Sequence, residues 1–142
     1  MLLTAKTEYA CLAVLELALH QHEVKPLRIV DISSRQGIPS RFLVQILLQL
    51  KAAGIVTSIR GASGGYRLSR PANTITLGEV TSVVAGDCTQ LTPNATTETP
   101  LSVALFQAWN QVTTAYQSHL DAISFDDLLQ ASVGQSEGMY YI

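Results

Sequence analysis

The sequence predicts a mainly α protein with one small β-hairpin and a long helix near its C-terminus. Three observations support this fold class. Apolar residues recur every three or four positions in three segments before Gly54, a β-rich stretch interrupted by glycines follows directly, and residues 101–120 carry an apolar band without any Lys or Arg. A chain of 142 residues has the usual size of one domain, so we expect one compact body with an appendage.

Three helices are predicted in the first third of the chain. The first spans residues 4–20 with Thr4 as its N-cap, and the second spans residues 27–36 and ends at Gly37. The third starts at Ile38-Pro39-Ser40 and ends at Gly54, and its expected apolar stripe consists of Phe42, Leu43, Ile46, Leu47, Leu50 and Ala53. Two helices joined across a tight glycine-containing turn are typical of a helix-turn-helix.

A β-hairpin is predicted directly after the third helix. Residues 55–60 and 66–70 are rich in strand-forming residues, and the glycine-rich tip from Gly61 to Gly65 separates them. A helix-turn-helix followed at once by a hairpin is a winged helix-turn-helix. Arg60 and Arg67 flank the tip, where cationic side chains suit the negative potential of a narrow minor groove.

The second half of the chain is expected to contain three further helices. Residues 76–85 form one for which Thr76 and Glu79 supply a capping box, and residues 87–100 form a loop. A long helix follows at 101–120, and a last capped helix at 124–129 precedes a frayed tail. We therefore divide the chain into a winged helix-turn-helix DNA-binding domain at 1–86, a loop at 87–100, and a dimerisation helix with a C-terminal tail at 101–142.

The long helix predicts a homodimer. A helix of about 20 residues spans roughly 30 Å, which exceeds what the small winged-helix core needs to cover it. Packing back onto the core is the alternative, but a partner helix across a two-fold axis is favoured because no other apolar surface is available to bury the band. The expected interface consists of Leu101, Leu105, Ala108, Trp109, Val112 and Tyr116.

The charges are segregated along the chain, although the net charge is only −2. All nine Lys and Arg residues fall in the first 70 positions. Residues 1–80 contain those nine basic residues and five acidic ones, a net charge of +4, whereas residues 81–142 contain six acidic residues and no basic one, a net charge of −6. The N-terminal part is therefore suited to approach phosphate and the C-terminal part is not.

Several other classes of protein fit the sequence poorly. The composition, with 47% hydrophobic and 14% charged residues, is that of a folding chain, and no apolar run is long enough for a membrane span, so a soluble cytoplasmic protein with no membrane partner is expected. An enzyme is not expected, because His20, His22 and His119 are not spaced against an acid or a nucleophile. The glycines at 61–65 lie in a hairpin and do not precede a helix, as a nucleotide-binding loop requires.

Short motifs spread over residues 3–80 match those of a known family. They are Leu3-Thr4-Ala5-Lys6, Tyr9-Ala10, Asp31-Ile32, Arg35-Gln36-Gly37-Ile38, Phe42-Leu43, Gln45, Leu50, Ala53-Gly54-Ile55-Val56, Ser58, Arg60-Gly61, Gly64-Gly65-Tyr66-Arg67-Leu68, Arg70-Pro71 and Ile75-Thr76-Leu77-Gly78-Glu79-Val80. The match is dense up to about residue 86, and the Arg-Gly-x-x-Gly-Gly-Tyr-x-Leu pattern after the Gly-Ile-Val strand is quite specific. On these residues the chain resembles the Rrf-two (Rrf2) family of bacterial winged-helix regulators.

The resemblance implies a dimer that binds double-stranded DNA, with the third helix in the major groove and the wing in the minor groove. It implies phosphate contacts for residues at the start of the first helix. The expected DNA-binding residues are Thr4, Lys6, Tyr9, Arg28, Pro39, Ser40, Arg41, Gln45, Lys51, Arg60, Gly61, Gly64 and Arg67. Ser40 as a simple cap, Arg41 and Lys51 as solvated charges, and Tyr9 as a core residue remain alternatives.

The sensor is where the chain departs from the family. Cluster-binding members carry three cysteines in the loop after the fourth helix, whereas this loop holds only Cys88, and a cluster needs about four ligands. Some members complete their site with a carboxylate or histidine from the first helix of the other subunit; Glu8 lies at such a position, and Cys11 lies one turn further along. No cofactor is favoured, which leaves a partner protein or a small molecule as the effector. An iron–sulfur cluster held by Cys88 with Glu8 and either Cys11 or a histidine remains open. A buried Cys11 and a Cys88 that is redox-active or has no function remain open as well.

A second class of function stays open as well. Winged helices also serve as protein-contact modules that do not bind DNA. Such a module has no reason to confine every Lys and Arg to residues 1–70, so the regulator is favoured.

Overall fold

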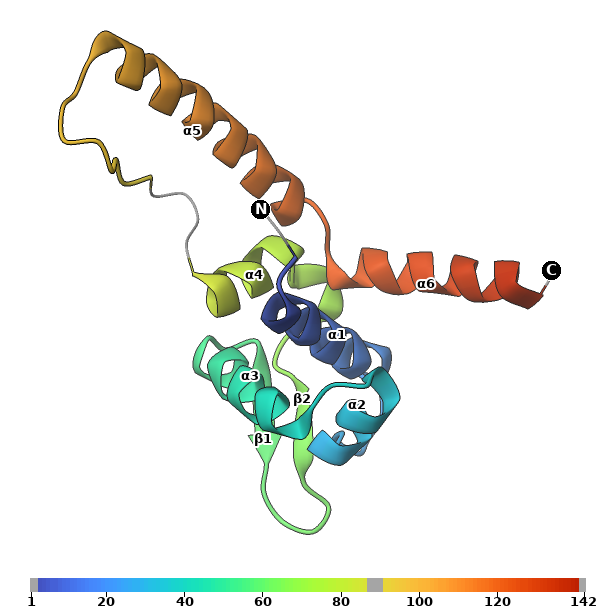
Figure 1. Cartoon of the computed structure of the whole chain (residues 1–142). Helices are drawn as coiled ribbons and strands as arrows, with labels where there is room; N and C mark the ends of the chain where they lie inside the picture. The colour runs from blue at the N-terminus through green and yellow to red at the C-terminus, as the bar shows by residue number, and fades with distance from the viewer. Residues whose placement is uncertain (1–2, 87–90, 141–142) are drawn as a thin grey trace.

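The structure is a computed structural model that describes residues 3–86 and 91–140, with side chains up to residue 135. Four helices and a hairpin form one body, from which two further helices project in different directions (Figure 1). The elements are α1 (Ala5–Leu19), α2 (Ile29–Gln36), α3 (Ser40–Ala52), β1 (Val56–Ile59), β2 (Gly65–Leu68), a 3-10 turn (Ala72–Thr74), α4 (Leu77–Ala85), α5 (Pro100–Asp121) and α6 (Phe125–Tyr140). The mainly α class with a small wing is confirmed.

The predicted helix ends are well defined in α1 and α2. The Thr4 hydroxyl oxygen accepts a hydrogen bond from the Thr7 amide at 3.2 Å, which caps α1. Gly37 ends α2 with a left-handed φ of 67°. The Ser33 hydroxyl then donates to the Ile38 carbonyl at 2.6 Å, so the turn between α2 and α3 is held by a side chain of α2.

The core lies between α1, α3, α4 and the base of the hairpin. Its largest fully buried side chains are Phe125, Leu17, Ile32, Ile38, Leu43, Ile46, Leu47, Leu50, Ile55 and Ile75. The side of α3 that enters this core is formed by Leu43, Ile46, Leu47 and Leu50. The wider stripe expected from the sequence is wrong at its two edges, because Phe42 and Ala53 are exposed; a helix on a small body buries only the middle of its apolar face.

The wing is an antiparallel pair in which Val56 faces Leu68 and Ile59 faces Gly65. Leu27 lies outside α2 and pairs with Tyr66, its amide and carbonyl hydrogen-bonding the Tyr66 backbone at 2.9 and 2.7 Å. A Cβ at Gly65 would lie 2.3 Å from the Leu27 carbonyl oxygen, so only glycine permits this close approach. The wing is thereby fixed to the segment before α2.

α4 differs from the predicted capping box in one respect. The Thr76 hydroxyl oxygen accepts from the Glu79 amide at 3.2 Å, as expected. The Glu79 carboxylate, however, pairs with the guanidinium of Arg70, because an ionised partner offers a stronger hydrogen bond than a backbone amide.

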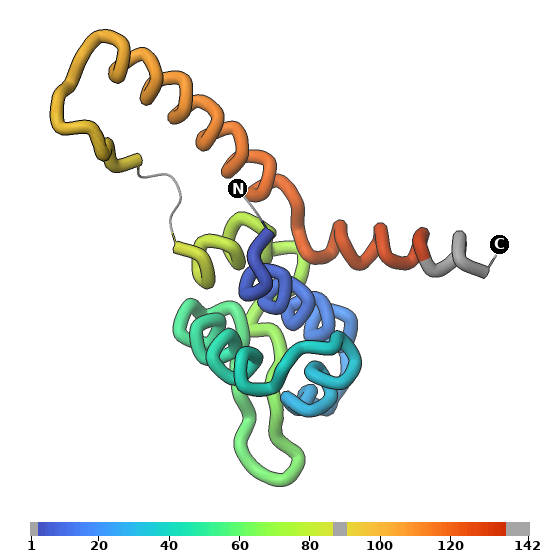
Figure 2. Tube along the Cα trace, viewed as in Figure 1, coloured from blue at the N-terminus to red at the C-terminus, as the bar shows by residue number. Residues whose placement is uncertain are grey.

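α5 begins with a reciprocal capping box between Thr99 and Ser102 and packs mainly against α4. Residues 91–99 lead from the body to the far end of α5, so the chain leaves the body and returns to it along this helix (Figure 2). Thr113 is its one buried residue. α5 is therefore not a core helix, which was the alternative considered from the sequence.

The end of the chain was predicted wrongly. The short final helix and the frayed tail at 134–142 are instead one helix, α6, that extends to Tyr140. Ser124 and Asp127 cap its start by exchanging hydrogen bonds of 2.9 and 3.1 Å, and Phe125 is fully buried in the core. A strongly anchored first turn offsets the cost of helix nucleation, so a sequence with two later glycines still continues as a helix. Among the described residues, no helix is both long and apolar enough to cross a membrane.

We expect Phe125→Ala to lower the free energy of unfolding by about 3–5 kcal/mol, because it removes a fully buried aromatic side chain from the core. Urea denaturation measures this loss. The control is Val133→Ala on the exposed side of the same helix, which should change stability by no more than about 0.5 kcal/mol. Equal effects of the two substitutions contradict the anchoring role of Phe125.

Candidate nucleic-acid interface

α3 presents one continuous face to solvent. Arg41, Val44, Gln45, Leu48 and Lys51 are exposed along it and follow one another at intervals of one or three residues. This spacing places them on the side of the helix opposite its core-facing leucines. A helix held by one face and open along the other has the geometry of a recognition helix.

No side chain caps the start of α3, which is where the sequence predicts contacts with DNA. Pro39 occupies the N-cap position without a side-chain hydrogen bond to the helix. The Ser40 hydroxyl does not cap the helix but lies 3.1 Å from the Ser33 hydroxyl of α2. The partly positive end of the helix dipole therefore faces outward, beside the turn between α2 and α3.

Aromatic contacts connect the start of α3 to α1. The Arg41 guanidinium carbon lies 4.9 Å from the centroid of the Phe42 ring, within cation–π range. The Phe42 ring lies 6.2 Å from the Tyr9 ring at an interplanar angle of 39°. Tyr9 thus packs at the edge of the core while remaining half-exposed, a position that combines the core role and the predicted surface role.

The predicted phosphate-binding residues at the start of α1 are exposed. Lys6 extends from the first turn, and the hydroxyl of Thr4 is engaged with Thr7. Arg28, at the N-cap of α2, lies 3.6 Å from the Asp31 carboxylate and remains largely exposed. Arg41, Lys51 and Arg60 form no ion pair with any residue that the structure describes, so their charges are available to a ligand.

The two wing arginines differ in their surroundings. Arg60 is exposed beside Gly61, whose φ of 105° turns the chain at the tip. The Gly64 amide closes this turn on the Gly61 carbonyl at 3.0 Å, and a Cβ at Gly64 would lie 2.1 Å from the Ile59 carbonyl oxygen. Arg67 instead donates to the Val24 carbonyl. The geometry therefore favours Arg60 as the groove contact and gives Arg67 a role in holding the loop before α2.

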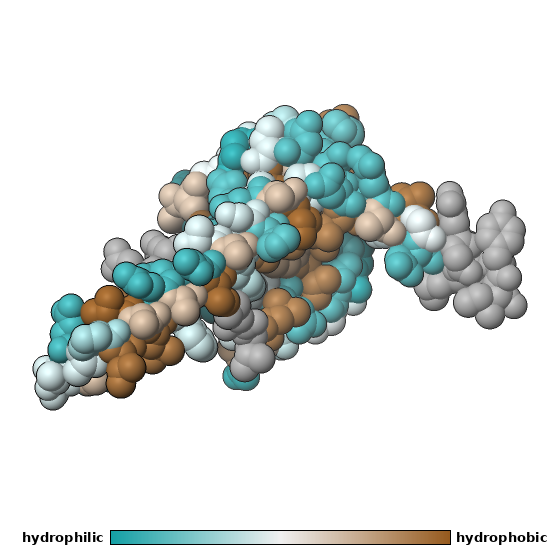
Figure 3. Space-filling view, turned by 90° about the horizontal axis from the view of Figure 1, so that it is seen from above, coloured by the Kyte–Doolittle hydropathy of each residue, from teal (hydrophilic) through white to brown (hydrophobic). Residues whose placement is uncertain are grey.

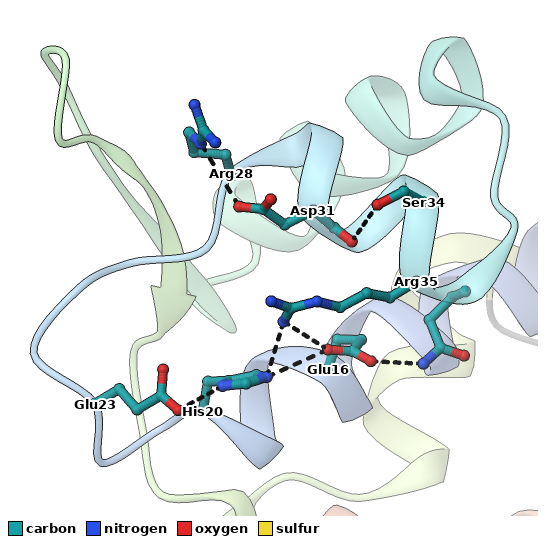
Figure 4. Close-up of polar contacts among 8 residues, drawn as sticks. Glu16, His20, Glu23, Arg28, Asp31, Ser34 and Arg35 are labelled. Atoms are coloured by element: carbon teal, nitrogen blue, oxygen red, sulfur yellow. Dashed lines mark hydrogen bonds and ion pairs between the residues drawn. The ribbon is translucent and has the colours of Figure 1, made fainter.

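A buried carboxylate couples α1 to α2. Glu16 is nearly fully buried, and one of its carboxylate oxygens accepts a hydrogen bond from the side-chain amide of Gln36 at 2.6 Å. The other oxygen lies 3.6 Å from Arg35 and 3.5 Å from His20, ion-pair distances without a hydrogen bond. His20 in turn contacts Glu23 at 2.7 Å, as Figure 4 shows. This cluster orients α2 and with it the turn that leads into α3.

The residues proposed for a cofactor are not assembled into a site. Glu8 is exposed, and Cys11 is half-buried on α1 beside the core. Burial raises the pKa of the Cys11 thiol to about 11, as expected of a small apolar residue at the edge of the core. No group of three His, Cys, Asp or Glu residues that could hold a metal ion occurs in the described ranges, and Cys88 lies outside them. The described residues of one protomer therefore do not by themselves form a cluster site.

α5 exposes the predicted dimerisation face. Leu101 is 84% exposed and Trp109 is 52% exposed, and Leu105, Ala108 and Val112 are exposed between and beyond them. Tyr116 is half-buried nearer the body. In the view from above, apolar side chains gather along the arm that contains this helix (Figure 3). A surface of this kind is typical of protein–protein contacts.

A helix-turn-helix with an open recognition helix, a wing and a separate apolar arm define a winged-helix regulator that binds DNA. The chain belongs to the Rrf2 family, described as iron-dependent transcriptional regulators, whose model matches residues 3–131. This confirms the family predicted from the sequence.

Curated relatives and solved structures support the same assignment. The transcriptional regulator IscR of Photobacterium profundum is 35% identical over 132 residues, which are 92% of this chain and 76% of the relative; that of Aliivibrio salmonicida is 37% identical over 131 residues, 91% and 77%. The structure of CymR, the global cysteine regulator of B. subtilis, has a TM-score of 0.80 at 28% identity and covers 92% of this chain and 98% of its own. The structure of T. potens IscR has a TM-score of 0.74 at 29% identity, with coverage of 93% and 88%.

Three features of the site were missed from the sequence. The exposed positions of Val44 and Leu48 follow from their spacing relative to Leu43 and Leu47, so that signal was present. The tilted ring contact between Phe42 and Tyr9 and the burial of Glu16 depend on contacts between helices, for which the sequence offered no local signal.

Proposed function

We propose that the protein acts as a homodimer in the cytoplasm and places α3 of each protomer in the major groove of duplex DNA, with the wing at the adjacent minor groove. The observation that carries this proposal is the solvent face of α3, on which Arg41, Gln45 and Lys51 stand exposed beyond an open helix start. Arg41 and Gln45 lie near the helix start, where side chains reach base edges. Lys51, at the far end of α3, contacts phosphate.

The remaining residues of the interface orient the protein on the duplex. Arg60 enters the minor groove, and the compact turn at Gly61 and Gly64 lets the backbone come close to the sugar-phosphate chain. Thr4, Lys6, Tyr9 and Arg28 contact phosphate oxygens from the body, while Pro39 and Ser40 lie at the helix start against the backbone or a base edge.

α5 supplies the dimer contact. It offers Leu101, Leu105, Trp109 and Val112 along one side without any basic residue nearby in sequence. Burying this side against a second copy removes apolar surface from water. It also holds two recognition helices at a fixed separation, so that two half-sites are bound together.

We further propose that the regulator responds to a partner protein or a small molecule and not to a three-cysteine cluster. The chain contains only two cysteines, and Cys88 is the only one in the loop that follows α4. A cluster held by Cys88 together with Glu8 and Cys11 is the alternative.

Binding to duplex DNA should weaken steeply as salt concentration rises, because a dimer with roughly 6–10 phosphate contacts releases a counterion for nearly every contact. If the affinity of the native protein does not change with salt concentration, DNA binding is excluded and the protein is a module for protein contacts.

Arg60→Ala should weaken binding to a selected operator by about 1–3 kcal/mol and relax its sequence preference. Arg60→Lys is the control, since it retains the charge but not the planar guanidinium. Fluorescence anisotropy measures the affinity in each experiment.

Leu105→Asp combined with Val112→Asp should give monomers that bind the operator far more weakly, since charges on the exposed apolar side of α5 oppose its burial. Light scattering measures the molecular mass. The matched control is Gln111→Asp combined with Thr114→Asp. Both positions are exposed and lie off the apolar side of α5, so this variant should remain a dimer. A dimer that persists in the first variant assigns the contact to another surface.

Protein purified without oxygen should be colourless and contain no iron or sulfide, because two cysteines supply too few ligands for the three-cysteine cluster. Visible absorption together with metal and sulfide analysis decides this. A coloured protein that Cys88→Ala bleaches establishes the alternative cluster and overturns the cluster-free proposal.

A further inference from the structure

Two branched apolar side chains stand in the middle of the solvent face of α3. Val44 is 39% exposed and Leu48 is 49% exposed, and they lie one helical turn apart. Their neighbours in sequence, Leu43 and Leu47, are fully buried in the core. The core therefore does not require apolar residues at positions 44 and 48.

The surroundings of this pair distinguish it from scattered surface residues. A single exposed Leu or Val is ordinary, and Phe42 on the same helix is partly covered by Tyr9. Val44 and Leu48, by contrast, share one face with Arg41 and Gln45, the face that the proposed function directs toward base edges. That face is continuous with the DNA interface, so its occupant is the major groove.

The major groove offers one apolar group, the C5 methyl of thymine. Gln45 lies between Val44 and Leu48 on this face. The side-chain amide of a glutamine can form hydrogen bonds with both N6 and N7 of adenine. An adenine on one strand pairs with a thymine whose methyl group projects into the same groove. The chemistry of the face is thus complementary to A·T pairs.

Resting on the proposed function, we propose that Val44 and Leu48 are specificity-determining residues that contact thymine methyl groups in each half-site. At a rise of about 1.5 Å per residue the two side chains are ~6 Å apart along α3. Base pairs are about 3.4 Å apart. The pair therefore spans roughly two base-pair steps and recognises up to two thymines close together.

The test removes the methyl groups from the DNA. A preferred duplex is first selected from a random-sequence library, and each thymine of its half-site is then replaced by uracil, which keeps the pairing and the O4 acceptor but lacks the methyl. Binding of the native protein should weaken about fourfold at one or two positions, the change expected from losing one buried methyl group of ~0.8 kcal/mol. Other thymines should tolerate the replacement.

Variants then assign each methyl to a side chain. Val44→Ala and Leu48→Ala should each abolish the thymine preference at one position, so that the affinities for the thymine duplex and the matching uracil duplex become equal there. Leu19→Ala, at an exposed position at the end of α1, is the matched control and should retain the full thymine preference.

The outcomes separate the two proposals. If the selection yields no preferred sequence, the proposed function fails. If a preferred sequence exists but uracil is tolerated throughout, or if both alanine variants keep the thymine preference, DNA binding stands and the assignment of Val44 and Leu48 is overturned. The uracil measurement changes only the DNA, so it decides the question even if a variant does not fold.

Discussion

The buried Glu16 carboxylate is the contact on which the placement of the recognition helix depends. α2 buries only Ile32, so apolar packing alone fixes it weakly on α1. Glu16 supplies the missing constraint through Gln36 and Arg35. A buried charge is costly unless it is paired, and the Gln36 hydrogen bond together with the Arg35 ion pair requires one position of α2. Because α2 is joined to α3 through a tight turn, the same contacts set the direction in which the face of α3 points.

A second set of contacts fixes the wing to the same frame. The Leu27 backbone pairs with Tyr66, and Arg67 donates to the Val24 carbonyl. The segment between α1 and α2 is thereby shared by the helix-turn-helix and the hairpin. Recognition of two adjacent grooves requires that the two reading elements keep their relative orientation before DNA arrives, since ordering them on binding costs free energy. The body of this Rrf2 family member provides that orientation through backbone hydrogen bonds.

Local signals in the sequence predicted most of the fold and failed where tertiary contacts decide. Gly37 and Thr4 define helix ends through their own backbone chemistry, so these boundaries were correct. The tail was wrong because Phe125 inserts into a core formed by residues far away in the chain, which the composition of 134–142 does not indicate. The charged and polar residues of the site were predicted from their types. Val44 and Leu48 were not named as site residues, although the predicted stripe through Leu43, Ile46 and Leu47 already left them off the core-facing side.

The junction between α5 and α6 joins the DNA-binding body next to the start of α4. Leu77 donates to the Ile123 carbonyl and Phe125 donates to the Ile75 carbonyl, each at 2.9 Å, on either side of a bridge between Thr76 and Ser124. The base of α5 is thus connected to the body by backbone hydrogen bonds. In the proposed dimer, a displacement of α5 against its partner is passed to the body through this junction, and it changes the separation of the two recognition helices.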